Sequence, residues 1–214
     1  MLKLVDRGAP PVRRARRYRL EADLLTGPEI EAVLEQCPVE SWTGMRNHTL
    51  IVVLWRTGLR ISEALALREK DIDLVEGRLV VQRGKGGKRR VGGLDQGTVD
   101  ALEEWLKRRA EIALPVAAPL LCTQRGGPID ASYIRRLLPR LARAAGVGKR
   151  VHAHGLRHVF ATELQAEGAP LSMIRDLLGH SSLATTDTYL RRLGAGEAVD
   201  FARRRSWTLD DNRT

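Results

Sequence analysis

The sequence lacks the long apolar segments and grouped metal ligands that would place it in several broad classes of protein. No apolar run in its 214 residues approaches the roughly 18 residues that a membrane-spanning helix needs. The charged N-terminus is not followed by the apolar core of a secretory signal. The carboxylates are scattered and do not stand at metal-ligand spacing. These absences predict a cytoplasmic protein and give no indication of a metal site.

Cysteine and tyrosine are also scarce. Cys37 and Cys122 stand alone and fit no metal-ligand spacing, so they are expected to be reduced, partly buried thiols. The three tyrosines are Tyr18, Tyr133 and Tyr189. Any chemistry that needs a phenol therefore has few candidates.

Positive charge, in contrast, is abundant and concentrated in two segments. The formal net charge is +10 and the pI is about 10.4. Residues 1–19 hold seven basic side chains and one acidic one, and residues 83–90 hold five basic side chains and no acid. Such clustering indicates a polyanionic partner, most commonly nucleic acid, with an acidic membrane surface or a solvated tail as alternatives. The side chains expected to contact DNA are Arg13, Arg14, Arg16, Arg17, Arg83, Lys88, Arg89 and Arg90.

Apolar periodicity predicts a mainly α-helical domain with one small antiparallel β-hairpin. Thr26 or Gly27 is expected to cap a first helix that has Pro28 in its first turn. The hairpin is expected to have strands at 79–81 and 89–91 joined by a turn at 84–87. Further helices are expected at 46–57, 61–67, 97–112, 131–145, 154–167, 171–178, 184–192 and 197–206.

Three short motifs combine residue types suited to metal-free attack on a phosphodiester. They are Thr57 to Glu63 (TGLRISE), His154 to His158 (HGLRH) and Gly179 to Tyr189 (GHSSLATTDTY). An arginine can grip two non-bridging oxygens and keep its charge as the five-coordinate phosphorus forms. A tyrosine hydroxyl has a pKa of about 10, and neighbouring guanidinium groups and a histidine would favour its phenolate.

The spacing within these motifs adds to the pattern. A helix that begins at His154 would present His154, Arg157 and His158 on one face near its N-terminus, where the dipole favours anions. Glu63 lies one turn after Arg60 and can brace its guanidinium. Lys85 lies among glycines in RGKGGK, without the form of a P-loop, and can donate a proton to a leaving 5′ oxygen.

Each motif alone also has an ordinary structural explanation. A surface arginine with a helical ion pair, a packed histidine, an interface tyrosine and a basic hairpin touching backbone phosphate would account for them one by one. The combination in one chain, in this order, favours a shared function.

Together these motifs resemble the tyrosine recombinases, the phage integrase family. The order Arg, Lys, His-x-x-Arg, His, Tyr is that family's, and so is the nine-residue gap from His180 to Tyr189. The resemblance covers roughly residues 24–207. It implies a basic N-terminal arm at 1–20, a tyrosine recombinase catalytic domain at 21–207 and a C-terminal tail at 208–214.

The resemblance also implies roles for particular residues. Tyr189 would attack the phosphate and form a 3′-phosphotyrosine link, Arg60 and Arg157 would hold the non-bridging oxygens, and Lys85 would protonate the leaving oxygen. His154 would transfer the tyrosine proton, and His180 would hydrogen-bond the phosphate. Glu63 and His158 would have supporting roles.

The same resemblance implies partners but no cofactor, since the covalent link conserves the bond energy without ATP or metal. The expected partners are double-stranded DNA, other copies of the chain in a tetramer on two DNA sites, and an accessory DNA-bending protein as a further candidate. The segment with Val199, Phe201 and Trp207 resembles the part that docks on a neighbouring protomer, with packing in cis as the alternative.

The sequence departs from the family pattern at two places. About 20 residues precede the catalytic part, where most members carry a helical domain that clamps DNA, so the chain is either a short recombinase or a catalytic fragment. Gly92 and Gly93 stand where the family often has proline, which leaves the end of the returning strand undefined. Two other functions remain open: a type IB topoisomerase that relaxes DNA, and a non-catalytic DNA-binding regulator of the same fold.

Overall fold

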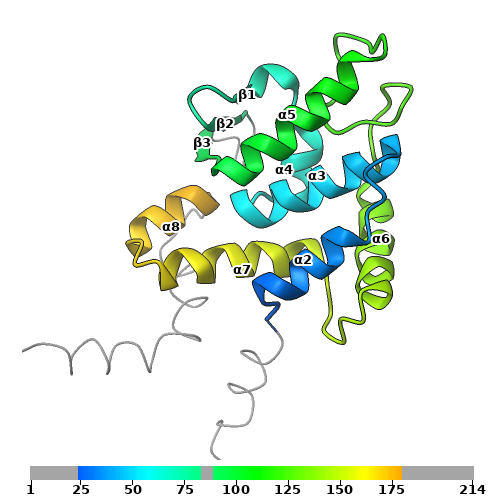
Figure 1. Ribbon diagram of the computed structural model, residues 1–214. Coiled ribbons are helices and arrows are strands. Elements are labelled where there is room, and N and C mark those ends of the chain that lie inside the picture. The colour runs from blue at the N-terminus through cyan, green and yellow to red at the C-terminus, as the bar shows by residue number, and fades with distance from the viewer. Residues whose placement is uncertain (1–23, 83–88, 180–214) are drawn as a thin grey trace, which may run out of the picture.

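A computed structural model of the chain describes residues 24–82 and 89–179 (Figure 1). These residues form a mainly helical fold with a small antiparallel sheet, which confirms the predicted fold class. The helices are α2 (Gly27–Glu35), α3 (Trp42–Thr57), α4 (Ile61–Ala66), the 3₁₀ helix η1 (Glu69–Asp71), α5 (Gln96–Ala110), α6 (Ala131–Ala144), α7 (Ala153–Ala166) and α8 (Leu171–Leu178). The strands are β1 (Ile72–Asp73), β2 (Arg78–Val81) and β3 (Arg90–Gly93).

Several predicted features lie outside the described residues. They are the arm at 1–20, the turn at 84–87, the helices at 184–192 and 197–206, and the tail at 208–214. Within the described ranges, no helix is both long and apolar enough to cross a membrane.

Helix α3 is the centre of the fold and lies between α5 and α7 (Figure 1). Its residues Leu50, Ile51, Val53 and Leu54 all have 0% exposed surface. Because consecutive positions point to different sides of a helix, this run is buried only if neighbours cover the helix on more than one side. Helices α5 and α7 supply that cover. The packing of α3 against α7 fixes where the ends of these two helices lie relative to each other.

The helix starts follow local capping chemistry. Thr26 caps α2 as expected: its hydroxyl accepts the Glu29 amide, and the Glu29 carboxylate accepts the Thr26 amide at 2.8 Å. Helix α3 begins at Trp42, four residues before the predicted start, because the Ser41 hydroxyl accepts the Gly44 amide at 3.0 Å.

The sheet has a third strand that the sequence did not predict. Strand β1 pairs antiparallel with β2, which pairs antiparallel with β3. With only two residues, β1 is too short to show an alternating pattern. The end of the returning strand, which the sequence left undefined, lies at Gly93: strand β3 includes both Gly92 and Gly93.

The register of β2 and β3 turns an arginine toward the protein interior. Val81 is opposite Arg90, and the next pair along the two strands is Val80 with Val91. Successive residues of a strand point to opposite faces of the sheet, so these two pairs lie on opposite faces. Val81 is buried, and Arg90, opposite it, shares its face. Val91 points the other way and is 53% exposed.

Helix α8 closes the side of the fold beside β3 and α7 (Figure 1). Its buried residues Ile174 and Leu178 form a small apolar cluster with Phe160 of α7. Phe160 also lies against Gly58, where a Cβ would come within 2.3 Å of the Phe160 ring. This packing brings the C-terminal ends of α3 and α8 together.

Candidate active site

Arg60 is held where α4 begins by the residue one turn further on. Arg60 is the N-cap of α4, and the Glu63 carboxylate accepts both the Arg60 amide and its guanidinium at 2.8 Å each. The Glu63 side chain is 4% exposed and that of Arg60 is 28% exposed. The structure therefore has the Arg60–Glu63 contact that the i, i+3 spacing suggested.

Gly58 allows the chain to turn from α3 into α4. It adopts φ 60° at the C-terminus of α3, a left-handed conformation that glycine takes at little cost. Its carbonyl oxygen accepts a hydrogen bond from the Arg157 guanidinium. The turn thus joins the motif around Arg60 to the motif around Arg157.

Arg157 lies inside the protein, near the start of α7. It is 2% exposed, and its guanidinium also donates to the Leu178 carbonyl at 2.5 Å. Helix α7 begins at Ala153, one residue before the predicted start, and its N-cap is His152. Protein carbonyls therefore fix the orientation of this guanidinium.

Three arginines converge on the last carbonyl groups of α8. Arg90 Nε donates to Leu177 at 3.1 Å, Arg157 to Leu178, and Arg60 to Gly179 at 3.3 Å. A helix C-terminus carries unpaired carbonyls and a partial negative charge, so it attracts cations. We call Arg60, Arg90 and Arg157, with the Glu63 carboxylate, the arginine cluster.

The arginine cluster carries a net positive charge, since it holds three guanidinium groups and one carboxylate, of which Arg60 and Arg90 bind Glu63 directly. Burial raises the pKa of this carboxyl, but hydrogen bonds from Arg90 and from the Arg60 amide, with the charge of Arg90, lower it to about 2. Glu63 is therefore ionised at neutral pH. The Arg60 side chain is 28% exposed, against 11% for that of Arg90, and Arg157 is buried, so Arg60 is best placed to meet an anion from outside.

The histidines of the second motif lie together at the start of α7. The rings of His154 and His158 are 4.7 Å apart, and that of His152 is 6.5 Å from His154. Desolvation, followed by the charges of Arg157, His152 and Arg60, lowers the pKa of His154 below its usual value. The imidazole is consequently neutral at neutral pH, the form that accepts a proton.

The remaining predicted residues divide into two groups. Arg89 is exposed, whereas Arg90 takes part in the arginine cluster. Lys85, His180 and Tyr189, together with Arg13, Arg14, Arg16, Arg17, Arg83 and Lys88, lie outside the described residues.

Sequence reasoning missed two contributors to this site. It assigned Arg90 to DNA contact and did not connect it with Glu63, 27 residues earlier. It also passed over His152, whose charge contributes to the low pKa of His154. The feature that could have identified Arg90 is its place at the start of a strand, opposite an apolar residue. The feature that could have identified His152 is its place two residues before His154.

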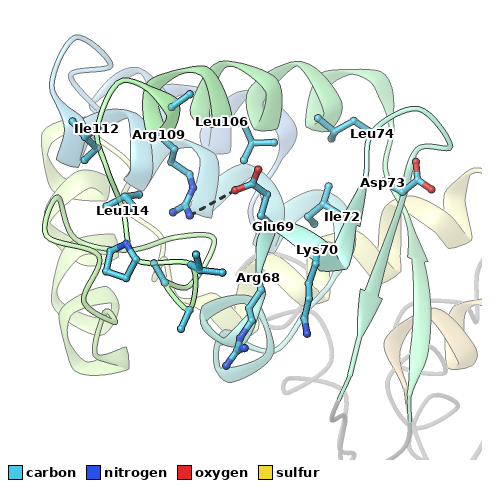
Figure 2. Close-up of a pocket in the computed structure, with 15 residues that line it drawn as sticks. Arg68, Glu69, Lys70, Ile72, Asp73, Leu74, Leu106, Arg109, Ile112 and Leu114 are labelled. Atoms are coloured by element: carbon cyan, nitrogen blue, oxygen red, sulfur yellow. Dashed lines mark ion pairs between the residues drawn. The ribbon is translucent and has the colours of Figure 1, made fainter.

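A pocket of about 1190 Å³ opens elsewhere, between η1, β1 and the C-terminal end of α5 (Figure 2). Apolar side chains such as Leu106 and Ile112 form its walls, and Arg109 reaches across toward Glu69 at 3.9 Å. The described members of the predicted site do not line it. No group of three metal-binding side chains was found within residues 24–82 and 89–179.

Comparison with known proteins places these residues in a family context. A model of the phage integrase family matches residues 23–194. Tyrosine recombinase XerC of Bacillus subtilis (strain 168) is 36% identical over 165 residues, which cover 75% of this chain and 54% of that protein. The chain thus spans about half the length of the curated relatives it matches.

Solved structures show the same relationship. The crystal structure of XerA recombinase has a TM-score of 0.73 at 29% identity, covering 86% of this chain and 64% of that one. XerH site-specific recombinase, bound to a palindromic difH substrate, has a TM-score of 0.69 at 30% identity over 85% of this chain and 52% of that one. The family match spans most of the sequence and includes all three motifs. This chain therefore belongs to the phage integrase family, the tyrosine recombinases.

Proposed function

We propose that this chain is the catalytic part of a site-specific DNA recombinase that cleaves and rejoins strands through a 3′-phosphotyrosine intermediate. One observation carries the proposal: Arg60 and Arg157, 97 positions apart, both donate to the C-terminal end of α8, directly before His180. The family match through residue 194 supports it, because that match includes Lys85, His180 and Tyr189. The proposed catalytic domain is 21–207, preceded by the arm at 1–20 and followed by the tail at 208–214.

In the proposed cleavage step, the Tyr189 oxygen attacks the scissile phosphorus and loses its proton. The bond from phosphorus to the 5′ oxygen breaks, and Lys85 gives that oxygen a proton. The products are a 3′-phosphotyrosine link and a free 5′ hydroxyl, so the phosphodiester energy is kept in the link. Attack by a 5′ hydroxyl on this link reverses the step and restores Tyr189.

The arginines stabilise the charge that grows on the phosphate oxygens in this step. Arg60 and Arg157 are proposed to bind the non-bridging oxygens, because fixed guanidinium groups need little reorganisation as that charge forms. His154 is proposed to take the Tyr189 proton, which agrees with its lowered pKa. His180 would add a hydrogen bond to the phosphate.

The proposed partners are double-stranded DNA and three further copies of the chain, with an accessory DNA-bending protein where the site requires one. The arm residues Arg13, Arg14, Arg16 and Arg17, and Arg83, Lys88 and Arg89 of the hairpin, are proposed to bind phosphate. Such contacts position a protein on DNA without reading its sequence. Action on chromosomal DNA would place the protein in the cytoplasm with the nucleoid.

Joining of DNA strands tests this proposal against relaxation alone. Genomic duplexes recovered as covalent complexes would be cloned in pairs into one supercoiled plasmid and incubated with the 214-residue chain. We expect products in which the two sites are joined, with Tyr189→Phe inactive. Relaxation of any plasmid without joined products would instead indicate a topoisomerase.

A non-catalytic DNA-binding regulator is the other rival. The intact set of Arg60, Lys85, Arg157 and Tyr189 favours an enzyme, since binding alone does not need a phenol at that place. Equal behaviour of wild type and Tyr189→Phe in a DNA-binding assay, with no cleavage by either, would support the regulator.

A further inference from the structure

Two neighbouring arginines at the base of the hairpin have different surroundings. Arg89 is exposed to solvent. Arg90, the first residue of β3, has a side chain that is 11% exposed. A basic residue that serves to attract DNA has no need to be desolvated in the free protein, so the burial of Arg90 points to another role.

Arg90 binds Glu63 with both ends of its guanidinium. Its two terminal nitrogens donate to Glu63 Oε1 at 2.8 Å and to Oε2 at 2.6 Å. Such a two-point contact adds strength and fixes the relative orientation of the arginine and the carboxylate. The same two oxygens accept the guanidinium and the amide of Arg60. The position of the Glu63 carboxylate, and through it that of Arg60, therefore depends on Arg90.

The third nitrogen of Arg90 joins this pair to α8. Its Nε donates to the Leu177 carbonyl at 3.1 Å, and its side chain lies against Gly179, where a Cβ would be 3.0 Å from Arg90 Cδ. All three guanidinium nitrogens thus donate to protein oxygens. Arg90 connects three segments that the proposed reaction needs together: the hairpin that carries Lys85, the start of α4 with Arg60, and the end of α8 before His180.

We infer that Arg90 is a positioning residue for strand cleavage, which orients Arg60 through Glu63 and holds the end of α8 against the base of the hairpin. This inference rests on the proposed function. It assigns to Arg90 a role different from that of Arg89, for which contact with a DNA phosphate remains the proposal. It does not require Arg90 to touch the DNA.

The test compares Arg90→Gln with Arg89→Gln, which removes the same charge from the adjacent position. Single-turnover cleavage of a nicked duplex is measured at saturating DNA, alongside the Kd for DNA at several salt concentrations and the Tm. We expect Arg90→Gln to cut about 100-fold more slowly, since a shift of about 1 Å in a reacting group costs that much, with its Kd unchanged. Arg89→Gln, at a proposed phosphate contact, is expected to bind DNA less tightly and, at saturating DNA, to lose far less of its cleavage rate than Arg90→Gln.

A double-mutant cycle separates positioning through Glu63 from a general loss of stability. In a Glu63→Gln background, Arg90→Gln is expected to add less than a threefold further loss of rate, because the partner through which it acts is already changed. Losses that multiply in the double variant would overturn the positioning of Arg60 through Glu63, since the contact with Leu177 alone would then carry the effect. The inference would also be overturned if Arg90→Gln raised the Kd for DNA and left the cleavage rate at saturation unchanged. The salt dependence of binding would then fall by about one phosphate contact.

Hydrogen exchange keeps the inference testable even if the chain cleaves no duplex. The amides of residues 174–179 and of Arg60 are expected to exchange faster in Arg90→Gln than in wild type, and at the wild-type rate in Arg89→Gln. Equal exchange in all three proteins would refute the positioning role. Absence of cleavage in wild type together with faster exchange in Arg90→Gln would contradict the proposed function and leave the structural link intact.

Discussion

At the scale of single residues, the site depends on how each arginine is held. Arg157 is nearly inaccessible and donates to the carbonyls of Gly58 and Leu178. Arg60 is more exposed and is braced by Glu63. The two are therefore fixed by different means, a buried set of carbonyls and a partly exposed ion pair, and their substitutions are expected to differ in effect.

Arg157→Ala should slow strand cleavage by about 10³- to 10⁵-fold, by analogy with arginines that stabilise the transition state of phosphoryl transfer. Single-turnover trapping on a nicked duplex measures this rate, and the Tm shows how much of the loss comes from the two carbonyls left without their donor. Arg157→Lys, which keeps the charge but cannot reach both carbonyls, is the matched variant. A loss of only a few-fold in Arg157→Ala would exclude the proposed role.

The Glu63 carboxyl should make folding stability depend on acid pH. Its pKa is lowered from 4.5 to about 2 in the folded chain, so it stabilises the fold fully above pH 4.5 and progressively less as the pH falls toward 2. The shift corresponds to about 3 kcal/mol. Urea unfolding of Glu63→Gln should show a deficit near neutral pH that disappears close to pH 2. The exposed Glu31 provides a control as Glu31→Gln, and a deficit for Glu63→Gln that stayed constant with pH would contradict this reading.

At the scale of secondary structure elements, the ends of α3 and α8 decide the geometry of the site. Both helices end in a left-handed glycine, Gly58 with φ 60° and Gly179 with φ 63°. A side chain at Gly58 would meet Phe160 of α7, so this turn forms without strain only when position 58 is glycine. The cluster of arginines thus relies on two short backbone turns in addition to side-chain contacts.

Gly58→Ala should destabilise the fold more than the same change at a glycine with free space. Gly146, after α6, has φ 70° and no atom within 4 Å of an added Cβ, whereas at Gly58 the Phe160 ring lies at 2.3 Å. Gly146→Ala is expected to cost about 1 kcal/mol for the left-handed conformation. Gly58→Ala is expected to cost about 1–3 kcal/mol more from overpacking. Equal free energies of unfolding for the two variants would show that Phe160 moves aside.

Local spacing predicted much of this arrangement, and long-range pairing accounts for what was missed. The helices were predictable because their apolar residues recur with the helical period, and the Arg60–Glu63 contact because it spans one turn. Strand β1 escaped notice because two residues show no period. The inward direction of Arg90 follows from its pairing with Val81, which only the register of the two strands reveals. The contact of Arg90 with Leu177 joins positions 87 apart, and no local sequence pattern extends that far.

At the scale of the whole molecule, charge is expected to govern DNA binding. The net charge of +10 is concentrated in the arm and the hairpin. Counterions released from DNA make such binding weaken steeply with salt, by about 0.9 in the logarithmic slope for each phosphate contact. We therefore expect the arm and the arginine cluster to have separable roles, the arm in affinity for DNA and the cluster in cleavage.

Replacing Arg16 and Arg17 by glutamine should lower the slope of log Kd against log salt by up to about 2. Lys107→Gln with Arg108→Gln is the control, since both side chains are ion-paired at the end of α5 and the change in net charge is the same. Fluorescence anisotropy with a labelled duplex at several salt concentrations gives both slopes. Identical slopes for the two double variants would place DNA binding outside the arm.

The most direct test of the central claim is covalent trapping of the chain on DNA. Nicked duplexes made from a pool of genomic fragments would be incubated with wild type and with Tyr189→Phe, and the products separated on a denaturing gel. We predict a protein–DNA band that resists SDS in wild type only, and the trapped fragments would reveal the target sequence. A band of equal strength in Tyr189→Phe, or none in wild type while DNA binding is intact, would contradict cleavage through this tyrosine.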